Sequence, residues 1–259
     1  MSNIFEPSTA LEQWIKIIRQ RSSFLSARGV LFLQIVVPEK QTIMSNLYPL
    51  VKPMLTPTLL GLNHAFSASD FYINAYDLLS CLYLYKGLDP YRRGDTHLTI
   101  FGYMELAAAV AGRYCSKTQS NILSGLNFEH ASFRGDLLTK FYGKENREKV
   151  LITSSNAGIF KGKCKCSEFV QNQGGKKSGI RAVYTNSLPH IDKKNLLVGN
   201  SMCERGVHPL GLTWWFLRIF ARVEFIWSPN VSYALIESDP PDIVISQNVE
   251  RFLPVPARS

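Results

Sequence analysis

The sequence lacks the features that mark a membrane-embedded or exported chain. It contains no uninterrupted apolar run of the roughly 18 residues that a membrane-spanning helix needs. The segment from Met1 to Pro7 has neither the basic stretch nor the apolar core of an export signal. We therefore expect no transmembrane segment in this chain and a cytoplasmic location, or a periplasmic one if a signal segment has been removed. No internal repeat is apparent, which argues against solenoid architectures.

Cysteine is scarce and odd in number, with five residues: Cys81, Cys115, Cys164, Cys166 and Cys203. Two of them lie on an apolar helical stretch or at its end, which favours free thiols in a reducing compartment. Cys164 and Cys166 lack the second ligand pair of a zinc site. We therefore expect no metal and no bound cofactor.

The composition is that of a soluble globular protein. With 259 residues, of which 46% are hydrophobic and 12% aromatic, the chain can bury a full core as one domain over 1–259. Its net charge of +9 points to an anionic partner, such as an acidic glycan, a phosphorylated cofactor, nucleic acid or an anionic membrane surface. Because no helix-turn-helix, finger or aromatic RNA platform is present, nucleic acid is the weakest of these.

Hydrophobic periodicity predicts alternating strands and helices. Helices are expected at 9–21, 76–85, 100–114 and from 212, and strands at 29–37, 71–74, 195–199, 223–227 and 243–246. This alternation predicts a parallel sheet with helices on both faces. The polar and basic stretch at about 116–194 is interpreted as an insertion or lid that crosses the site.

One half of a hydrolytic triad is suggested where the helix at 100–114 begins. Asp95 lies two residues before His97 in a polar loop. An Asp at this spacing can accept a hydrogen bond from imidazole Nδ1 and leave Nε2 free to act as a general base. Arg92 comes just before the pair, so its charge would lie beside the imidazole.

The other half is suggested by the strand at 195–199, which ends in a tight Gly199-Asn200-Ser201 turn. Such a turn can expose a serine nucleophile, and Asn200 either assists at the oxyanion or only stabilises the turn. Lys40 follows the carboxyl end of the strand at 29–37, where ligands bind in open α/β sheets, although a solvated lysine would also fit. Ser201, His97 and Asp95 form the working hypothesis for catalysis, with Asn200, Lys40 and Arg92 as substrate-binding or oxyanion candidates.

These motifs give the chain a resemblance to a known group of proteins. From about Leu25 to Leu253, it resembles the SGNH-hydrolase-like domain of the alginate O-acetyltransferase group, which are bacterial polysaccharide O-acetyltransferases. The matching pieces are Val37-Pro38-Glu39-Lys40, Asp95-Thr96-His97, Gly135-Asp136-Leu137, Gly199-Asn200-Ser201 and Pro241-Asp242-Ile243. As in that group, Asp and His precede the serine. The group usually has Trp where this chain has Leu98, and Asp where it has Asn200.

The resemblance implies a three-layer α/β/α sandwich with a central parallel sheet. It also implies acyl transfer, most simply of acetyl, to hydroxyls of a glycan through an acyl-serine, with Ser201 as nucleophile, His97 as base and Asp95 as its orienting residue. The partners would be a glycan acceptor, which the charge suggests is anionic, and an acyl donor or donor protein; acyl-coenzyme A fits a cytoplasmic location. The alternatives are a carbohydrate esterase and a non-catalytic glycan-binding module with a decayed triad.

Overall fold

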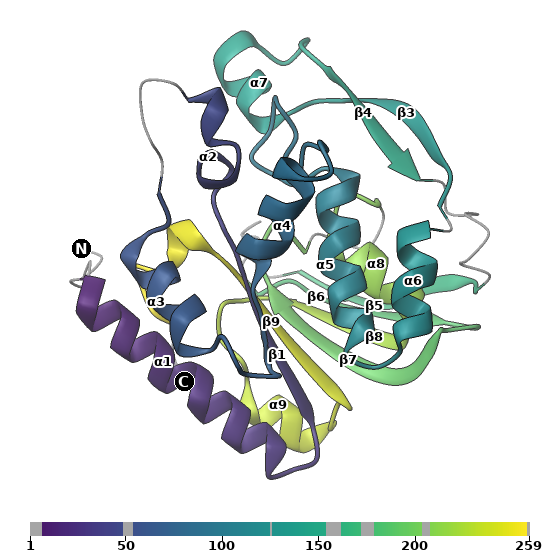
Figure 1. Cartoon of the computed structure of the whole chain (residues 1–259). Helices are drawn as coiled ribbons and strands as arrows, with labels where there is room; N and C mark the ends of the chain where they lie inside the picture. The colour runs from purple at the N-terminus through teal and green to yellow at the C-terminus, as the bar shows by residue number, and fades with distance from the viewer. Residues whose placement is uncertain are drawn as a thin grey trace.

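The computed structural model describes residues 7–48, 54–124, 126–153, 162–171, 179–203 and 208–257. Its centre is a seven-stranded sheet in the order β2-β1-β9-β7-β8-β6-β5, flanked by helices (Figure 1). The strands of this sheet are β1 (Leu31–Val37), β2 (Tyr72–Ile73), β5 (Cys164–Val170), β6 (Arg181–Asn186), β7 (Ile191–Gly199), β8 (Phe220–Trp227) and β9 (Ile243–Val249). The fold is the predicted α/β sandwich.

The helices that cover the sheet form two layers. They are α1 (Pro7–Ser26), α3 (Pro57–Ala65), α4 (Ala75–Leu84), α5 (Ile100–Gly112), α6 (Ser116–Ser124), α8 (Leu212–Ile219) and α9 (Tyr233–Ser238), with the shorter α2 (Lys40–Ile43), η1 (Ser45–Leu47) and η2 (Glu250–Phe252) between them. Helices α4, α5 and α8 pack into one hydrophobic core, whereas α1, α3 and α9 pack into the other.

Alternating side chains of the buried strands supply both cores. On β1, Leu33 and Ile35 face the α4–α5–α8 core, while Phe32 and Val36 face the α1–α3–α9 core. Because a strand buried on both faces must be apolar at nearly every position, β1 is the continuous apolar run seen in the sequence. The strand exposes none of its residues from 32 to 37.

The parallel strands end together and so define the edge where the site lies. Strand β9 pairs in parallel with β1, with Val249 opposite Val37, and with β7, with Ser246 opposite Val198. Strand β8 continues the parallel order, with Trp227 opposite Gly199. In such sheets ligands bind beyond the carboxyl ends of the strands.

The sheet is not parallel throughout. Strands β5 and β6 pair antiparallel at one edge, and β6 pairs antiparallel with β8, so the prediction of a parallel sheet holds for β2, β1, β9, β7 and β8. Strands β5 and β6 are joined by a connection of only 171–180, which is too short for the crossover that parallel pairing needs.

The range 116–194, predicted as an insertion or lid, divides into several parts. Strands β5 and β6 and the start of β7 belong to the central sheet. Helix α6 packs on α5, and among the described residues β3 (Phe128–Phe133), α7 (Asp136–Tyr142) and β4 (Glu148–Thr153) leave the sandwich, as a separate antiparallel pair with a helix between. This excursion, shown in teal in Figure 1, projects from the sandwich beside α4 and α5. Much of the basic Lys161–Lys163 and Gln173–Lys177 loops lies outside the described residues.

Two chain-wide features bear on the sequence predictions. Across the described ranges, no helix is both long enough and apolar enough to cross a membrane. All five cysteines have free thiols.

Candidate active site

The Asp95–His97 pair has the predicted geometry. The carboxylate Oδ1 of Asp95 lies 2.6 Å from His97 Nδ1 and accepts a hydrogen bond of 2.8 Å from the His97 backbone N–H. Thr99 then caps α5 by accepting a hydrogen bond from the Gly102 N–H, so the helix begins three residues after the imidazole. Within the described chain His97 Nε2 has no hydrogen-bond partner, and the side chain is 21% exposed. This nitrogen is free to take up a proton.

The second carboxylate oxygen of Asp95 holds the loop to the rest of the molecule. It accepts from the Arg92 guanidinium at 2.9 Å and from the Asp136 N–H at 3.1 Å. Burial raises the pKa of Asp95, but the hydrogen bond from His97 and the charge of Arg92 outweigh burial, so its net pKa is lowered. Asp95 is therefore a buried, ionised hydrogen-bond acceptor for the imidazole.

Lys40, which lies just after the end of β1, forms hydrogen bonds with the same loop. Its Nζ donates to the backbone carbonyls of Arg93 at 2.6 Å and Asp95 at 3.3 Å. Burial lowers the pKa of Lys40, and the carboxylates of Glu148 and Asp95 oppose this effect. Lys40 and Arg92 thus both contact groups of the Asp95–His97 loop; a direct role in substrate binding stays a prediction.

The Ser201 turn lies just beyond β7. Asn200 Oδ1 accepts from the Met202 N–H at 3.1 Å, and the Asn200 carbonyl accepts from the Cys203 N–H at 2.9 Å. These bonds form the turn-stabilising arrangement considered for Asn200. A Cβ atom at Gly199 would lie 2.4 Å from Cys203 Sγ, so the turn requires glycine there. Neither the hydroxyl nor the N–H of Ser201 has a hydrogen-bond partner among the described residues.

A contact joins α5, the helix that follows His97, to the Ser201 turn. The Tyr103 hydroxyl donates to Met202 Sδ at 3.7 Å, in the buried core. Tyr103 lies in the first turn of the helix that follows His97, and Met202 directly follows Ser201. Both halves therefore lie at the carboxyl edge of the sheet, although no hydrogen bond joins Ser201 to His97 within the described ranges.

Three residues that were not predicted as site residues also contact this region. Asp136, in the first turn of α7, accepts from the Thr96 N–H at 2.8 Å. Glu148, at the start of β4, accepts from the Gly94 N–H at 3.0 Å. The His208 ring packs on Phe133 at 4.5 Å between centroids, and burial followed by the charge of Arg92 lowers the His208 pKa. Only Asp136 was marked in the sequence, as part of the Gly135-Asp136-Leu137 match.

Asp95, His97 and Asp136 form a group that a metal ion could bind, because each offers a ligand atom within 4.8 Å of the others. The Arg92 guanidinium already contacts Asp95 at 2.9 Å, so a metal cation would compete with a resident positive charge. Hydrogen bonding among His97, Asp95 and Arg92 accounts for the arrangement without a metal.

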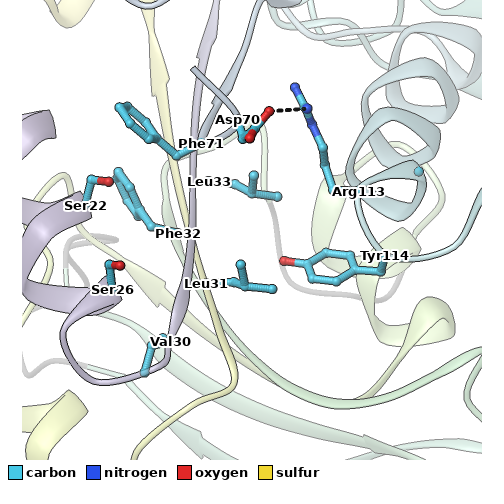
Figure 2. A pocket seen from close by; sticks show the side chains of 11 residues that line it. Ser22, Ser26, Val30, Leu31, Phe32, Leu33, Asp70, Phe71, Arg113 and Tyr114 are labelled. Atoms are coloured by element: carbon cyan, nitrogen blue, oxygen red, sulfur yellow. Dashed lines mark ion pairs between the residues drawn. The ribbon is translucent and has the colours of Figure 1, made fainter. Parts of the chain in front are cut away.

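A separate cavity of about 490 Å³ lies at the opposite edge of the sheet, at the start of β1. Figure 2 shows it between Ser22 and Ser26 of α1 and the Arg113–Asp70 ion pair, with the Tyr114 hydroxyl pointing toward β1. None of the predicted catalytic residues lines it. Since β1 spans roughly 20 Å from Leu31 to Val37, this cavity is remote from His97.

The helices and the central sheet define a three-layer α/β/α sandwich, with the Asp95–His97 loop and the Ser201 turn beyond its strands. No protein-family model and no curated protein matches the sequence. Among solved structures, the chain is similar to the O-acetyltransferase domain of AlgJ from Pseudomonas putida, with a TM-score of 0.59 and 17% identity over 97% of this chain and 86% of that one.

It is also similar to PatB1 from Bacillus cereus, with a TM-score of 0.68 and 14% identity over 100% of this chain and 94% of PatB1. A structure of PatB1 with a sulfonyl adduct gives a TM-score of 0.65 and 13% identity over 98% and 91% of the two chains. The resemblance predicted from the sequence is therefore confirmed for the fold.

Proposed function

We propose that this protein is an O-acyltransferase that moves an acyl group to a hydroxyl of a glycan through an acyl-serine intermediate. The observation that carries the proposal is the buried, ionised Asp95 that orients His97 at the same sheet edge as the Ser201 turn. The fold shared with the AlgJ O-acetyltransferase domain supports the reaction class.

In the first half-reaction, His97 Nε2 takes the proton of the Ser201 hydroxyl as the oxygen attacks the acyl carbonyl of the donor. The Ser201 N–H, which has no described partner, is available to donate to the developing oxyanion. The bond between the acyl carbon and the donor oxygen then breaks, and the proton on His97 passes to that leaving oxygen. The product is acyl-Ser201 and free donor alcohol.

In the second half-reaction, His97 takes a proton from the acceptor hydroxyl as that oxygen attacks the acyl carbon. The bond between the acyl carbon and the Ser201 oxygen then breaks, and His97 returns the proton to Ser201. Asp95 stabilises the imidazolium in both halves by accepting from Nδ1. Water could replace the sugar, which would make the enzyme an esterase, so acceptor dependence decides between transfer and hydrolysis.

The proposal is tested by incubating the protein with p-nitrophenyl acetate, with and without a panel of oligosaccharides. We expect acetylated oligosaccharide by mass spectrometry and faster p-nitrophenol release when the right acceptor is present. A phenylsulfonyl fluoride should label Ser201 and abolish both signals, as a sulfonyl group adds to PatB1. Turnover that persists fully in Ser201→Ala would refute the proposal.

A further inference from the structure

A cavity lies beside Ser201, and the loop that carries His97 does not line it. A cavity of about 400 Å³ opens beside Gly199, Asn200 and Ser201. Its other described lining residues come from α1, from the end of β8 and the two residues after it, and from the stretch between the end of β9 and Val255. Those that bear on its chemistry are Trp14, Gln247, Asn248, Arg251, Phe252 and Val255. No residue of the 91–99 loop is among them.

The position of the cavity relative to His97 determines which part of the substrate it can hold. His97 must reach both the leaving oxygen of the donor and the hydroxyl of the acceptor, because it transfers a proton to one and from the other. Both groups therefore approach Ser201 from the His97 side. The acyl chain is the remaining substituent of the carbonyl carbon, and it does not need to approach His97. It can therefore enter the cavity, which no residue of the His97 loop lines.

The chemistry of the lining also favours an acyl chain over a sugar ring. Several polar side chains of the cavity are already paired within the protein: Arg251 Nε with Glu39 at 2.7 Å, and Asn248 Oδ1 with Gln34 Nε2 at 3.0 Å. Gln247 Oε1 likewise accepts from the Asn200 N–H and from Cys203 Sγ. A sugar needs hydrogen-bond partners to replace water, and Arg251 Nε, Asn248 Oδ1 and Gln247 Oε1 already have partners within the protein.

Apolar side chains make up the accessible wall. Phe252 is 53% exposed and Val255 is 52% exposed, at the mouth of the cavity. The indole N–H of Trp14 is bound to the Leu253 carbonyl at 2.8 Å, so this tryptophan contributes its apolar ring. A cavity of about 400 Å³ lies within the range of small-ligand pockets, of roughly 300–1,000 Å³, and is larger than the methyl of an acetyl group requires.

We infer that this cavity is an acyl pocket, and that the protein transfers linear acyl chains longer than acetyl. The inference rests on the proposed function, because it places the chain on the acyl carbon that Ser201 attacks. The covalent step is unchanged: the Ser201 oxygen bonds to the acyl carbon, the donor carbon–oxygen bond breaks, and the serine proton leaves with the donor oxygen. The contribution of the cavity is to bury the methylene groups of the acyl chain.

The experiment measures kcat/KM for p-nitrophenyl acetate, butyrate, hexanoate and octanoate, which share one leaving group. Burying each added methylene group should raise kcat/KM by about fourfold until the cavity is full, so butyrate, with two more methylene groups, should exceed acetate by about 15-fold. Val255→Trp narrows the mouth. It should lower kcat/KM for hexanoate by at least tenfold and leave acetate within about twofold.

The matched control is Val170→Trp on β5, because Val170 is 47% exposed and does not line this cavity. It should leave the whole ester series unchanged. Phe252→Ala, which widens the mouth, serves as a second variant if Val255→Trp does not fold; it should move the preferred ester toward octanoate.

The possible outcomes separate this inference from the proposed function. If acetate is the best ester and neither cavity variant changes the profile, the acyl pocket is refuted while Ser201-dependent turnover keeps the proposed function. If ester turnover is independent of Ser201, both fail. A long-chain preference that Val255→Trp removes and Val170→Trp does not would establish the pocket.

Discussion

The Asp95–His97 loop and the Ser201 turn lie at one edge of the sheet but are held in place differently. Distant residues hold the loop: Lys40 and Asp136 bind its backbone and the Asp95 carboxylate. The Ser201 turn combines the local bond from the Met202 N–H to Asn200 Oδ1 with bonds from distant segments, most of which join backbone atoms. These are the N–H groups of Leu212, Thr213 and Ser228, which donate to the carbonyls of Met202, Cys203 and Gly199, and the Asn200 N–H, which donates to Gln247 Oε1. Side-chain substitutions in distant segments should therefore disturb the base more than the nucleophile, because the long-range bonds of the Ser201 turn are mostly between backbone atoms.

The largest expected effect comes from substituting Ser201, His97 or both. Ser201→Ala and His97→Ala should each lower ester kcat by on the order of 10³, because the pair acts as one unit. The double variant should be little slower than either single variant. Steady-state kinetics on one p-nitrophenyl ester measures all three, and additive losses would show that the two residues do not work together.

The orienting role of Asp95 should produce the next largest effect. Asp95→Asn keeps the size of the side chain but offers an amide to His97 Nδ1, so kcat should fall by on the order of 10². Asp89→Asn is the matched control, because Asp89 pairs only at the surface, with Arg93 at 3.1 Å. Equal losses in the two variants would remove Asp95 from the mechanism.

The lowered pKa of Asp95 gives this substitution a signature in stability. Since the folded-state pKa lies below the unfolded value of about 3.9, the carboxylate stabilises the fold above that pH, and the effect is lost as the pH falls through the folded-state pKa. The difference in unfolding free energy between wild type and Asp95→Asn should therefore shrink on acidification. Urea unfolding from pH 7 to pH 3 measures it, and a constant difference would contradict the assignment.

The sequence was sufficient to predict the interactions that are local. The Asp95–His97 contact spans two residues, as does the Asn200–Met202 bond of the serine turn. The apolar run of β1 likewise indicated a strand buried on both faces. Each of these depends on spacing along the chain, which periodicity and turn chemistry can reveal.

The contacts between distant segments could not be predicted in this way. Nothing in the spacing links Glu148 to the Gly94 N–H, or Lys40 to the Arg93 carbonyl, because tertiary packing brings these groups together. For the same reason, the sequence predicted the charge of Arg92 beside the imidazole but not the direct contact of its guanidinium with the Asp95 carboxylate. The antiparallel pairing of β5 and β6 also depends on neighbours that local pattern does not specify.

Gly135→Ala should disturb the loop without changing any side chain in it. A Cβ at Gly135 would lie 1.9 Å from the Gly94 carbonyl oxygen, so the backbone beside Asp95 must shift, at a cost of about 1–3 kcal/mol. Gly61→Ala is the control, because its Cβ would meet only the flexible end of Leu11. For Gly135→Ala, both kcat and the free energy of unfolding measured by chemical denaturation should fall. An unaffected kcat would mean that α7 does not position the loop.

The smallest effect should come from surface charge. Arg93 is 75% exposed, so Arg93→Ala removes positive charge near His97 while leaving the Arg92–Asp95 contact intact. For an anionic glycan acceptor we expect KM to rise by up to about threefold at low salt, and the difference to vanish as the Debye length falls below ~10 Å above 0.1 M. Arg92→Ala should instead lower kcat at every salt concentration. Salt-independent KM values would argue against an anionic acceptor.

The most direct test of the central claim is to trap the acyl-enzyme. Wild type is mixed with p-nitrophenyl butyrate, quenched with acid within milliseconds and digested for mass spectrometry. The account predicts a butyryl group on Ser201 of the wild type, lost in Ser201→Ala and strongly reduced in His97→Ala. A butyryl group on another residue, or equal labelling of Ser201→Ala, would contradict it.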